Sequence, residues 1–151
     1  MTTIAYKDRV MAADSRETSI CDGESPMVLN DDCTKIFKLS DGSLFGASRG
    51  SEEIERLHQS LVDNLPPPKL EDINGLLVKP DETIWLYEGN IWQKIRQTYY
   101  AVGSGSLFAF AAMDAGASAI EAAEIGAKRD PYSGGKVIHL RLRSKKKDPD
   151  A

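Results

Sequence analysis

The spacing of apolar positions changes along the chain. Up to residue 48, and again over residues 73–102, short apolar runs alternate with polar breaks, which is typical of strands. Between these regions Ile54, Leu57 and Leu61 recur three and four positions apart, as on one face of a helix, and prolines at 66–68 end that pattern. The expected strands cover residues 4–6, 10–13, 35–39, 43–47, 73–78, 83–87, 99–102 and 136–142.

Polar segments connect the early strands. Lys7-Asp8 breaks the first apolar run as in a hairpin, and Asp41-Gly42 supplies the positive φ that a second tight hairpin requires. Residues 18–34 are polar and rich in Asp and Gly, so we expect a long loop there, beside the strand ends. The runs at 73–102 are expected to form a second sheet.

Two Ala-rich helices are expected at residues 106–115 and 118–128. Gly116 is placed to stop the first, and Ser118 with Glu121 forms the pattern of a capping box at the second. The order along the chain is therefore strands, helix, strands, helices, strand. This α+β pattern indicates two stacked sheets with helices on their outer faces.

Composition and charge narrow the functional classes. With 151 residues, 41% hydrophobic and 28% charged, the chain is expected to be one soluble domain, residues 1–151. A net charge of −4 argues against a nucleic-acid partner, and no apolar stretch approaches the ~20 residues that cross a bilayer. The first residues lack a secretory signal, so the cytoplasm is the expected location.

The C-terminal residues 143–151 are expected to form a flexible charged tail. Basic residues at 141–147 are followed at once by Asp148-Pro149-Asp150, which favours a solvated tail over a nucleic-acid or docking patch, the second interpretation.

Neither a metal nor a cofactor is expected. Cys21 and Cys33 lack ligand spacing and are interpreted as reduced thiols, and only His58 and His139 could join them. Neither Gly-Ser-rich stretch has the spacing and Gly-Lys-Ser/Thr ending of a phosphate-binding loop.

Six short strings occur in an order and spacing that resemble one family along nearly the whole chain. They are Thr2-Thr3-Ile4, Ala12-Ala-Asp-Ser-Arg16, Thr34-Lys-Ile36, Gly46-Ala-Ser-Arg-Gly50, Val102-Gly-Ser-Gly-Ser106 and Arg129-Asp-Pro-Tyr-Ser-Gly-Gly135. Each is weak alone, but together they resemble the β-type proteasome subunits and HslV-type peptidases of the N-terminal nucleophile hydrolase superfamily. The resemblance implies a four-layer αββα sandwich of two antiparallel sheets. Because the prolines at 66–68 lead almost directly into a strand, one outer helical layer is expected to keep a single helix.

The resemblance also implies that Thr2, exposed by removal of Met1, is the nucleophile of a threonine peptidase. In that family the α-amine of the same residue acts as base, and a terminal amine with a pKa of roughly 7.7–8.0 suits the task. Lys35 matches the lysine whose charge lowers the proton affinity of the nucleophile and amine, with Asp14 as its partner. Without the flanking strings, both would be interpreted as exposed surface residues.

Three further residues match the polar group that positions the amine in that family, namely Ser104, Asp130 and Ser133. A helix N-cap at Ser104 and turns at the other two are alternative roles, compatible with the first. The backbone N–H of Arg49 or Gly50 would form the oxyanion hole, since either can donate an amide. Arg49 is bulky and charged and would lie beside the substrate channel, so the substrate preference is left open.

The expected activity is endopeptidase cleavage of peptides or unfolded proteins through an acyl-enzyme. The same resemblance implies a homo-oligomer, with a ring form and an ATP-dependent unfoldase partner left open. A non-catalytic assembly subunit and a small-molecule amidase of the same superfamily are the alternatives.

Overall fold

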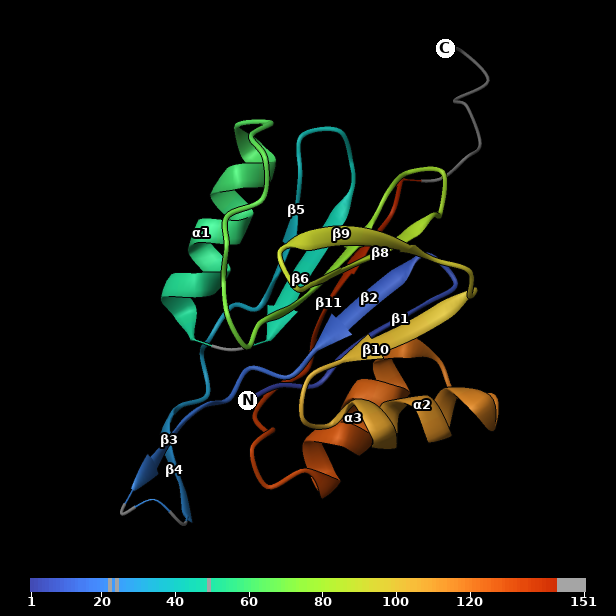
Figure 1. Ribbon diagram of the computed structural model, residues 1–151. Coiled ribbons are helices and arrows are strands. Elements are labelled where there is room, and N and C mark those ends of the chain that lie inside the picture. The colour runs from blue at the N-terminus through green and yellow to red at the C-terminus, as the bar shows by residue number, and fades with distance from the viewer. Residues whose placement is uncertain (22, 24, 49, 144–151) are drawn as a thin grey trace.

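A computed structural model describes residues 1–21, 23, 25–48 and 50–143 of the chain. Two antiparallel sheets, one of five strands and one of four, are stacked face to face (Figure 1). One helix covers the outer face of the five-stranded sheet, and two helices cover the outer face of the four-stranded sheet. The part of the expected tail that spans 144–151 lies outside the described residues, as does Arg49.

The four-stranded sheet has the order β10-β1-β2-β11. Its strands are β1 (Ile4–Lys7), β2 (Val10–Ala13), β10 (Tyr99–Val102) and β11 (Ile138–Arg141). The predicted first hairpin is confirmed, with Ile4 opposite Ala13, and its two-residue turn places Asp8 and Arg9 at φ 50° and 69°. Both values are left-handed, as the tight turns that match strand twist require.

The five-stranded sheet has the order β5-β6-β7-β8-β9. Its strands are β5 (Ile36–Lys38), β6 (Leu44–Ser48), β7 (Asn74–Val78), β8 (Ile84–Glu88) and β9 (Ile91–Ile95). Gly42 has a φ of 91° in the turn between β5 and β6, as the Asp-Gly pair predicts. The strand β9 was not expected, because it is a largely exposed edge strand without a continuous apolar run.

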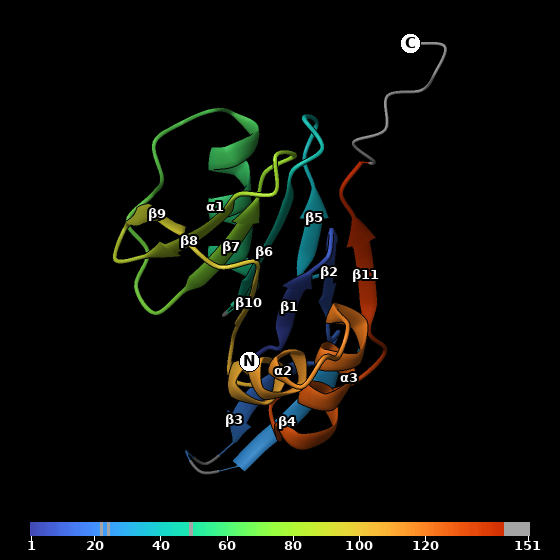
Figure 2. The ribbon, with the colours of Figure 1, turned by 90° about the vertical axis from the view of Figure 1, so that its right-hand side faces the viewer.

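Three helices cover the outer faces, namely α1 (Ser51–Val62), α2 (Ser106–Asp114) and α3 (Ala119–Arg129). Figure 2 shows α2 and α3 side by side on the four-stranded sheet, with α1 on the far side of the other sheet. The capping box of Ser118 and Glu121 is present, and Gly116 follows α2 at a φ of 104°. None of the helices in the described ranges has the length and apolar character that crossing a bilayer requires.

Alternation along the strands produces three apolar cores. Ile4 and Tyr6 of β1 face the gap between the sheets, where they pack with Leu44 and Leu76, whereas Ala5 faces α2 and α3. The third core joins α1 to the outer face of the five-stranded sheet. The four layers α–β–β–α that result are the predicted fold class.

The layer outside the five-stranded sheet consists of α1 alone among the described residues, as predicted. The segment after α1 runs back to β7 without a helix. The Tyr87 hydroxyl anchors this segment, since it donates to the Pro68 carbonyl at 2.5 Å and accepts from the Leu70 N–H at 3.1 Å.

Two sequence predictions were wrong. Most of the predicted loop at 18–34 is a β-hairpin of β3 (Glu17–Cys21) and β4 (Ser25–Asn30) that projects from the body of the molecule (Figures 1 and 2). It has no buried face to impose an apolar–polar alternation, so the pattern did not reveal it. The strand β10 was assigned to the second sheet but pairs with β1, because backbone register and not local pattern selects the partner.

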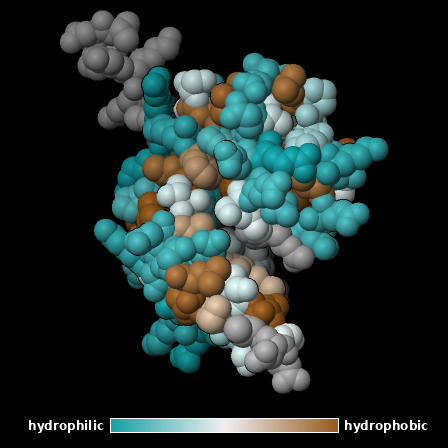
Figure 3. Space-filling model, turned by 90° about the vertical axis from the view of Figure 1, so that its left-hand side faces the viewer, coloured by the Kyte–Doolittle hydropathy of each residue, from teal (hydrophilic) through white to brown (hydrophobic). Residues whose placement is uncertain are grey.

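The projecting hairpin carries several exposed apolar side chains. Figure 3 shows apolar surface gathered at this end of the molecule. The exposed apolar residues of the hairpin are Ile20, Met27, Val28 and Leu29. Several exposed apolar side chains on one projecting segment are typical of a surface that contacts another molecule.

Candidate active site

Thr2 and Thr3 extend the path of β1 into the interior between the ends of β2 and β10. The Thr2 carbonyl accepts from the Gly105 N–H at 3.1 Å, and the Thr3 carbonyl accepts from the Asp14 N–H at 3.1 Å. Thr2 is 1% exposed and Thr3 is fully buried. The residue predicted to be the nucleophile is therefore held by backbone contacts from both neighbouring segments.

Close backbone approach explains the glycines around these two threonines. A Cβ at Gly105 would lie 1.8 Å from Thr3 Oγ1, and a Cβ at Gly126 would lie 2.3 Å from Thr3 Cγ2. Glycine is therefore required at both positions for α2 and α3 to reach the start of β1. The sequence analysis missed Gly126, although an isolated glycine inside a predicted helix is a signal of close packing.

Ser104, Asp130 and Ser133 form one hydrogen-bonded group, and Ser104 joins it to the backbone nitrogen of Thr2. The Thr2 N–H donates to Ser104 Oγ at 3.1 Å. The hydroxyls of Ser104 and Ser133 both donate to Asp130 Oδ2, at 2.5 and 2.6 Å. The structure thus brings these three sequence-predicted residues together, although they come from the β10–α2 turn and the segment after α3.

The alternative structural roles hold only in part. Gly105, not Ser104, is the N-cap of α2, and no side chain caps that helix. Asp130 does form a turn, because its Oδ1 accepts from the Tyr132 N–H at 3.2 Å while Oδ2 binds the two hydroxyls. One carboxylate therefore shapes the turn after α3 and orients the groups at Thr2.

Lys35 and Asp14 form a buried ion pair. Lys35 Nζ lies 3.0 Å from both carboxylate oxygens, and the two side chains are 3% and 0% exposed. The Asp14 carboxylate also accepts backbone N–H groups from Thr3, Arg16 and Gly134 at 3.0–3.3 Å. Because the carboxylate is this well satisfied, the pair can remain charged away from water.

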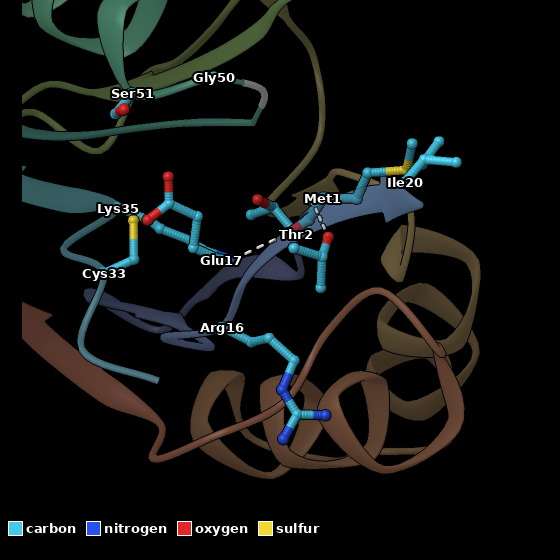
Figure 4. Close-up of a pocket in the computed structure, with 10 residues that line it drawn as sticks. Met1, Thr2, Arg16, Glu17, Ile20, Cys33, Lys35, Gly50 and Ser51 are labelled. Atoms are coloured by element: carbon cyan, nitrogen blue, oxygen red, sulfur yellow. Dashed lines mark hydrogen bonds between the residues drawn. The ribbon is translucent and has the colours of Figure 1, made fainter. Parts of the chain in front are cut away.

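Met1 occupies the remaining hydrogen-bonding position of the Lys35 ammonium. The Met1 carbonyl accepts from Lys35 Nζ at 2.9 Å, and the Met1 amine donates to Thr18 Oγ1 at 3.4 Å (Figure 4). Burial lowers the pKa of this amine from its usual 8.0, and the nearby Lys35 charge lowers that pKa further, while Asp14 opposes both. In the chain with Met1, therefore, Lys35 contacts the carbonyl that precedes Thr2.

A pocket of about 260 Å³ opens beside Met1, Thr2 and Lys35 (Figure 4). Gly50 and Ser51, at the start of α1, line its opposite side. The N-terminus of a helix favours negative charge, because its first N–H groups have no partners within the helix. Gly50, one of the two predicted oxyanion donors, is therefore at the pocket; Arg49, the other, lies outside the described residues.

The described residues contain no group of three or more His, Cys, Asp or Glu side chains placed to hold a metal ion. The pocket offers the Thr2 hydroxyl, the Lys35 ammonium, the Arg16 guanidinium, the Glu17 carboxylate and the Cys33 thiol. Methionine removal would turn the Thr2 backbone nitrogen into an amine.

No protein-family model and no curated protein sequence matches the chain. Its structure does resemble solved structures over nearly its whole length. Thiobacillus denitrificans BPH in complex with epoxomicin covers 95% of this chain and 99% of its own, with a TM-score of 0.61 and 19% identity. BPH of the same organism without that ligand covers 94% and 98%, with a TM-score of 0.60 and 20% identity.

A third similar structure is eukaryotic HslV from Trypanosoma brucei, which covers 93% of this chain and 98% of its own, with a TM-score of 0.61 and 15% identity. At such identities the likeness establishes the fold. The chain has the fold of these BPH and HslV structures, and its four layers are those that the sequence resemblance predicts.

Proposed function

We propose that the chain is a threonine-type endopeptidase that cleaves peptides or unfolded proteins through an acyl-enzyme on Thr2. The observation that carries the proposal is that two polar groups meet at the Met1–Thr2 peptide bond. Lys35, paired with Asp14, contacts the carbonyl that precedes Thr2, and Ser104 with Asp130 holds the Thr2 nitrogen.

Removal of Met1 gives Thr2 a free amine next to its own hydroxyl. The amine accepts the proton of Oγ1, through a water where one is needed, and Oγ1 attacks the carbonyl carbon of the scissile peptide bond. An ester bond forms, the peptide C–N bond breaks, and the proton passes to the leaving amine. Water then hydrolyses the ester by the same route, which returns the hydroxyl to Thr2.

The other site residues stabilise the charges that this cycle creates. The Lys35 ammonium favours the deprotonated hydroxyl and the neutral amine, because a nearby positive charge opposes protonation. Ser104, oriented by Asp130, holds the amine. The backbone N–H of Gly50 or Arg49, at the start of α1, would bind the oxyanion of the tetrahedral intermediate.

The replacement of Thr2 tests the proposal directly. We expect Thr2→Ala to abolish hydrolysis of fluorogenic peptides, whereas Thr2→Ser keeps a measurable rate because serine retains both hydroxyl and amine. Intact mass should show that Met1 is absent, and incubation with epoxomicin should add its mass to wild type but not to Thr2→Ala. Exposed Thr98 provides the matched control, since Thr98→Ala should hydrolyse at the wild-type rate.

Unchanged hydrolysis by Thr2→Ala would contradict the proposal. Absence of hydrolysis by the wild-type chain after Met1 removal would favour a non-catalytic assembly subunit. Cleavage of simple amides but not of peptides would favour an amidase.

The rate should depend on pH through the Thr2 amine. Burial and the Lys35 charge lower the pKa of the Met1 amine, and the Thr2 amine lies one residue deeper, near the same ammonium. The neutral amine is the base, so a lowered pKa means that kcat/KM rises with pH and levels off below about pH 8. A profile measured from pH 5 to 9 that is still rising above pH 8 would contradict this assignment.

We also propose that copies of the chain assemble through the β3–β4 hairpin. Its exposed apolar side chains support an interface, and the resemblance to HslV-type peptidases predicts a homo-oligomer. Native mass spectrometry of wild type and of a Val28→Lys variant tests the interface. A ring form and an unfoldase partner stay predictions from that resemblance.

A further inference from the structure

We infer that the pocket beside Thr2 accepts a basic side chain and that Glu17 selects it, so that the preferred substrates are peptides with Lys or Arg before the cleaved bond. The inference rests on the proposed peptidase function, because that function makes the pocket next to the nucleophile a substrate pocket.

Two cations at the pocket are each paired with a carboxylate. Lys35 is paired with both oxygens of Asp14. Arg16 makes two parallel hydrogen bonds to Asp31, from Nε to Oδ1 at 2.8 Å and from Nη2 to Oδ2 at 3.1 Å. This pairing raises the pKa of Arg16 and lowers that of Asp31, so both groups stay charged and cancel each other at neutral pH.

Glu17 contributes a carboxylate to the pocket wall. It is the first residue of β3 and is partly buried, and its Oε2 accepts from Asn30 Nδ2 across the hairpin at 2.7 Å. The amide holds the carboxylate in place but brings no positive charge. Within the described ranges no ion pair forms at Glu17, so its carboxylate is available to a cation that enters the pocket.

The position of Glu17 is suited to contact a substrate. Figure 4 shows its side chain extending away from that of Arg16, on the side of the pocket that carries Cys33 and Ser51. Burial raises the pKa of the Cys33 thiol, Lys35 opposes the rise, and Glu17 adds to it, which places the Glu17 charge near that sulfur. The thiol is therefore uncharged at neutral pH and does not compete for a cation.

The other pocket walls suit a long basic side chain. Thr18 and Ser51 contribute hydroxyl groups, and Ile20 offers aliphatic surface to a methylene stem. A volume of about 260 Å³ exists while Met1 still lines the pocket, and removal of Met1 takes that side chain off the wall. An ammonium or guanidinium could then reach the Glu17 carboxylate.

Hydrolysis of matched peptides measures the preference. Wild type, Glu17→Gln and the control Glu124→Gln, on the exposed face of α3, are compared on fluorogenic peptides that end in Arg or in Leu. We expect wild type to prefer the Arg peptide in kcat/KM. Glu17→Gln should lower that preference about tenfold or more, since it removes a charge-assisted hydrogen bond. Glu124→Gln should behave as wild type.

A binding measurement separates this inference from the peptidase proposal. The same peptides are titrated into Thr2→Ala, and into Thr2→Ala with Glu17→Gln, and followed by NMR chemical shifts of pocket residues. Tighter binding of the Arg peptide that Glu17→Gln removes supports the pocket assignment even if wild type hydrolyses neither peptide. Equal or tighter binding of the Leu peptide, or a preference for Arg that survives Glu17→Gln, overturns it.

Discussion

A chain that keeps Met1 is expected to show no measurable peptidase activity, a loss of at least about a thousandfold relative to the chain that begins at Thr2. With Met1 in place the Thr2 nitrogen is an amide, which cannot act as a base. The Met1 carbonyl also occupies the Lys35 ammonium at 2.9 Å, and the Met1 side chain lines the pocket. Removal of one residue therefore creates the base, frees the ammonium and opens the substrate space.

This prediction can be measured on two preparations of the same sequence. One carries Met1, and the other is released from a cleavable leader so that it starts at Thr2; intact mass identifies each. The two should unfold at similar urea concentrations, because the Lys35–Asp14 pair and the sheets do not depend on Met1. Comparable hydrolysis by both preparations would show that the free amine of Thr2 is not the base.

The fold was predictable wherever local chemistry determines it. Gly42 adopts the positive φ that Asp-Gly predicts, and Ser118 with Glu121 forms the predicted capping box. The β3–β4 hairpin and the edge strand β9 were missed, because strands with exposed faces lack the apolar periodicity on which the prediction depends. The partner of β10 was also misassigned, since pairing with β1 is a long-range choice that a local pattern does not contain.

The candidate site was predictable only from short strings, not from periodicity. Thr2, Lys35 and Ser104 lie far apart in sequence, and nothing in the spacing of apolar residues brings them together. The strings identified these residues. In the structure the Thr2 N–H donates to Ser104 Oγ, and Lys35 Nζ donates to the Met1 carbonyl next to Thr2. Glu17 and the Met1–Lys35 contact were missed, because each acquires meaning only when the hairpin folds beside the start of β1.

The second large effect is expected for Lys35→Met. Methionine approximates the length of the lysine side chain but removes its charge, so Asp14 becomes a buried, unpaired carboxylate. Loss of one partner of a buried ion pair costs roughly 3–5 kcal/mol of stability. If Lys35 also lowers the proton affinity at Thr2, peptide hydrolysis should fall by about a thousandfold as well. Urea unfolding and kcat/KM measure the two effects separately.

A double variant distinguishes a chemical role of Lys35 from a structural one. Asp14→Asn removes the orphaned charge but keeps an oxygen that can accept the Thr3 N–H, so Lys35→Met with Asp14→Asn should recover much of the stability without recovering hydrolysis. Lys38→Met is the matched control, because Lys38 lies exposed on the same segment and donates to the Arg141 carbonyl, away from Thr2. Hydrolysis that returns along with stability in the double variant would assign Lys35 to the scaffold, since an ammonium that acts on Thr2 cannot be replaced by restored packing.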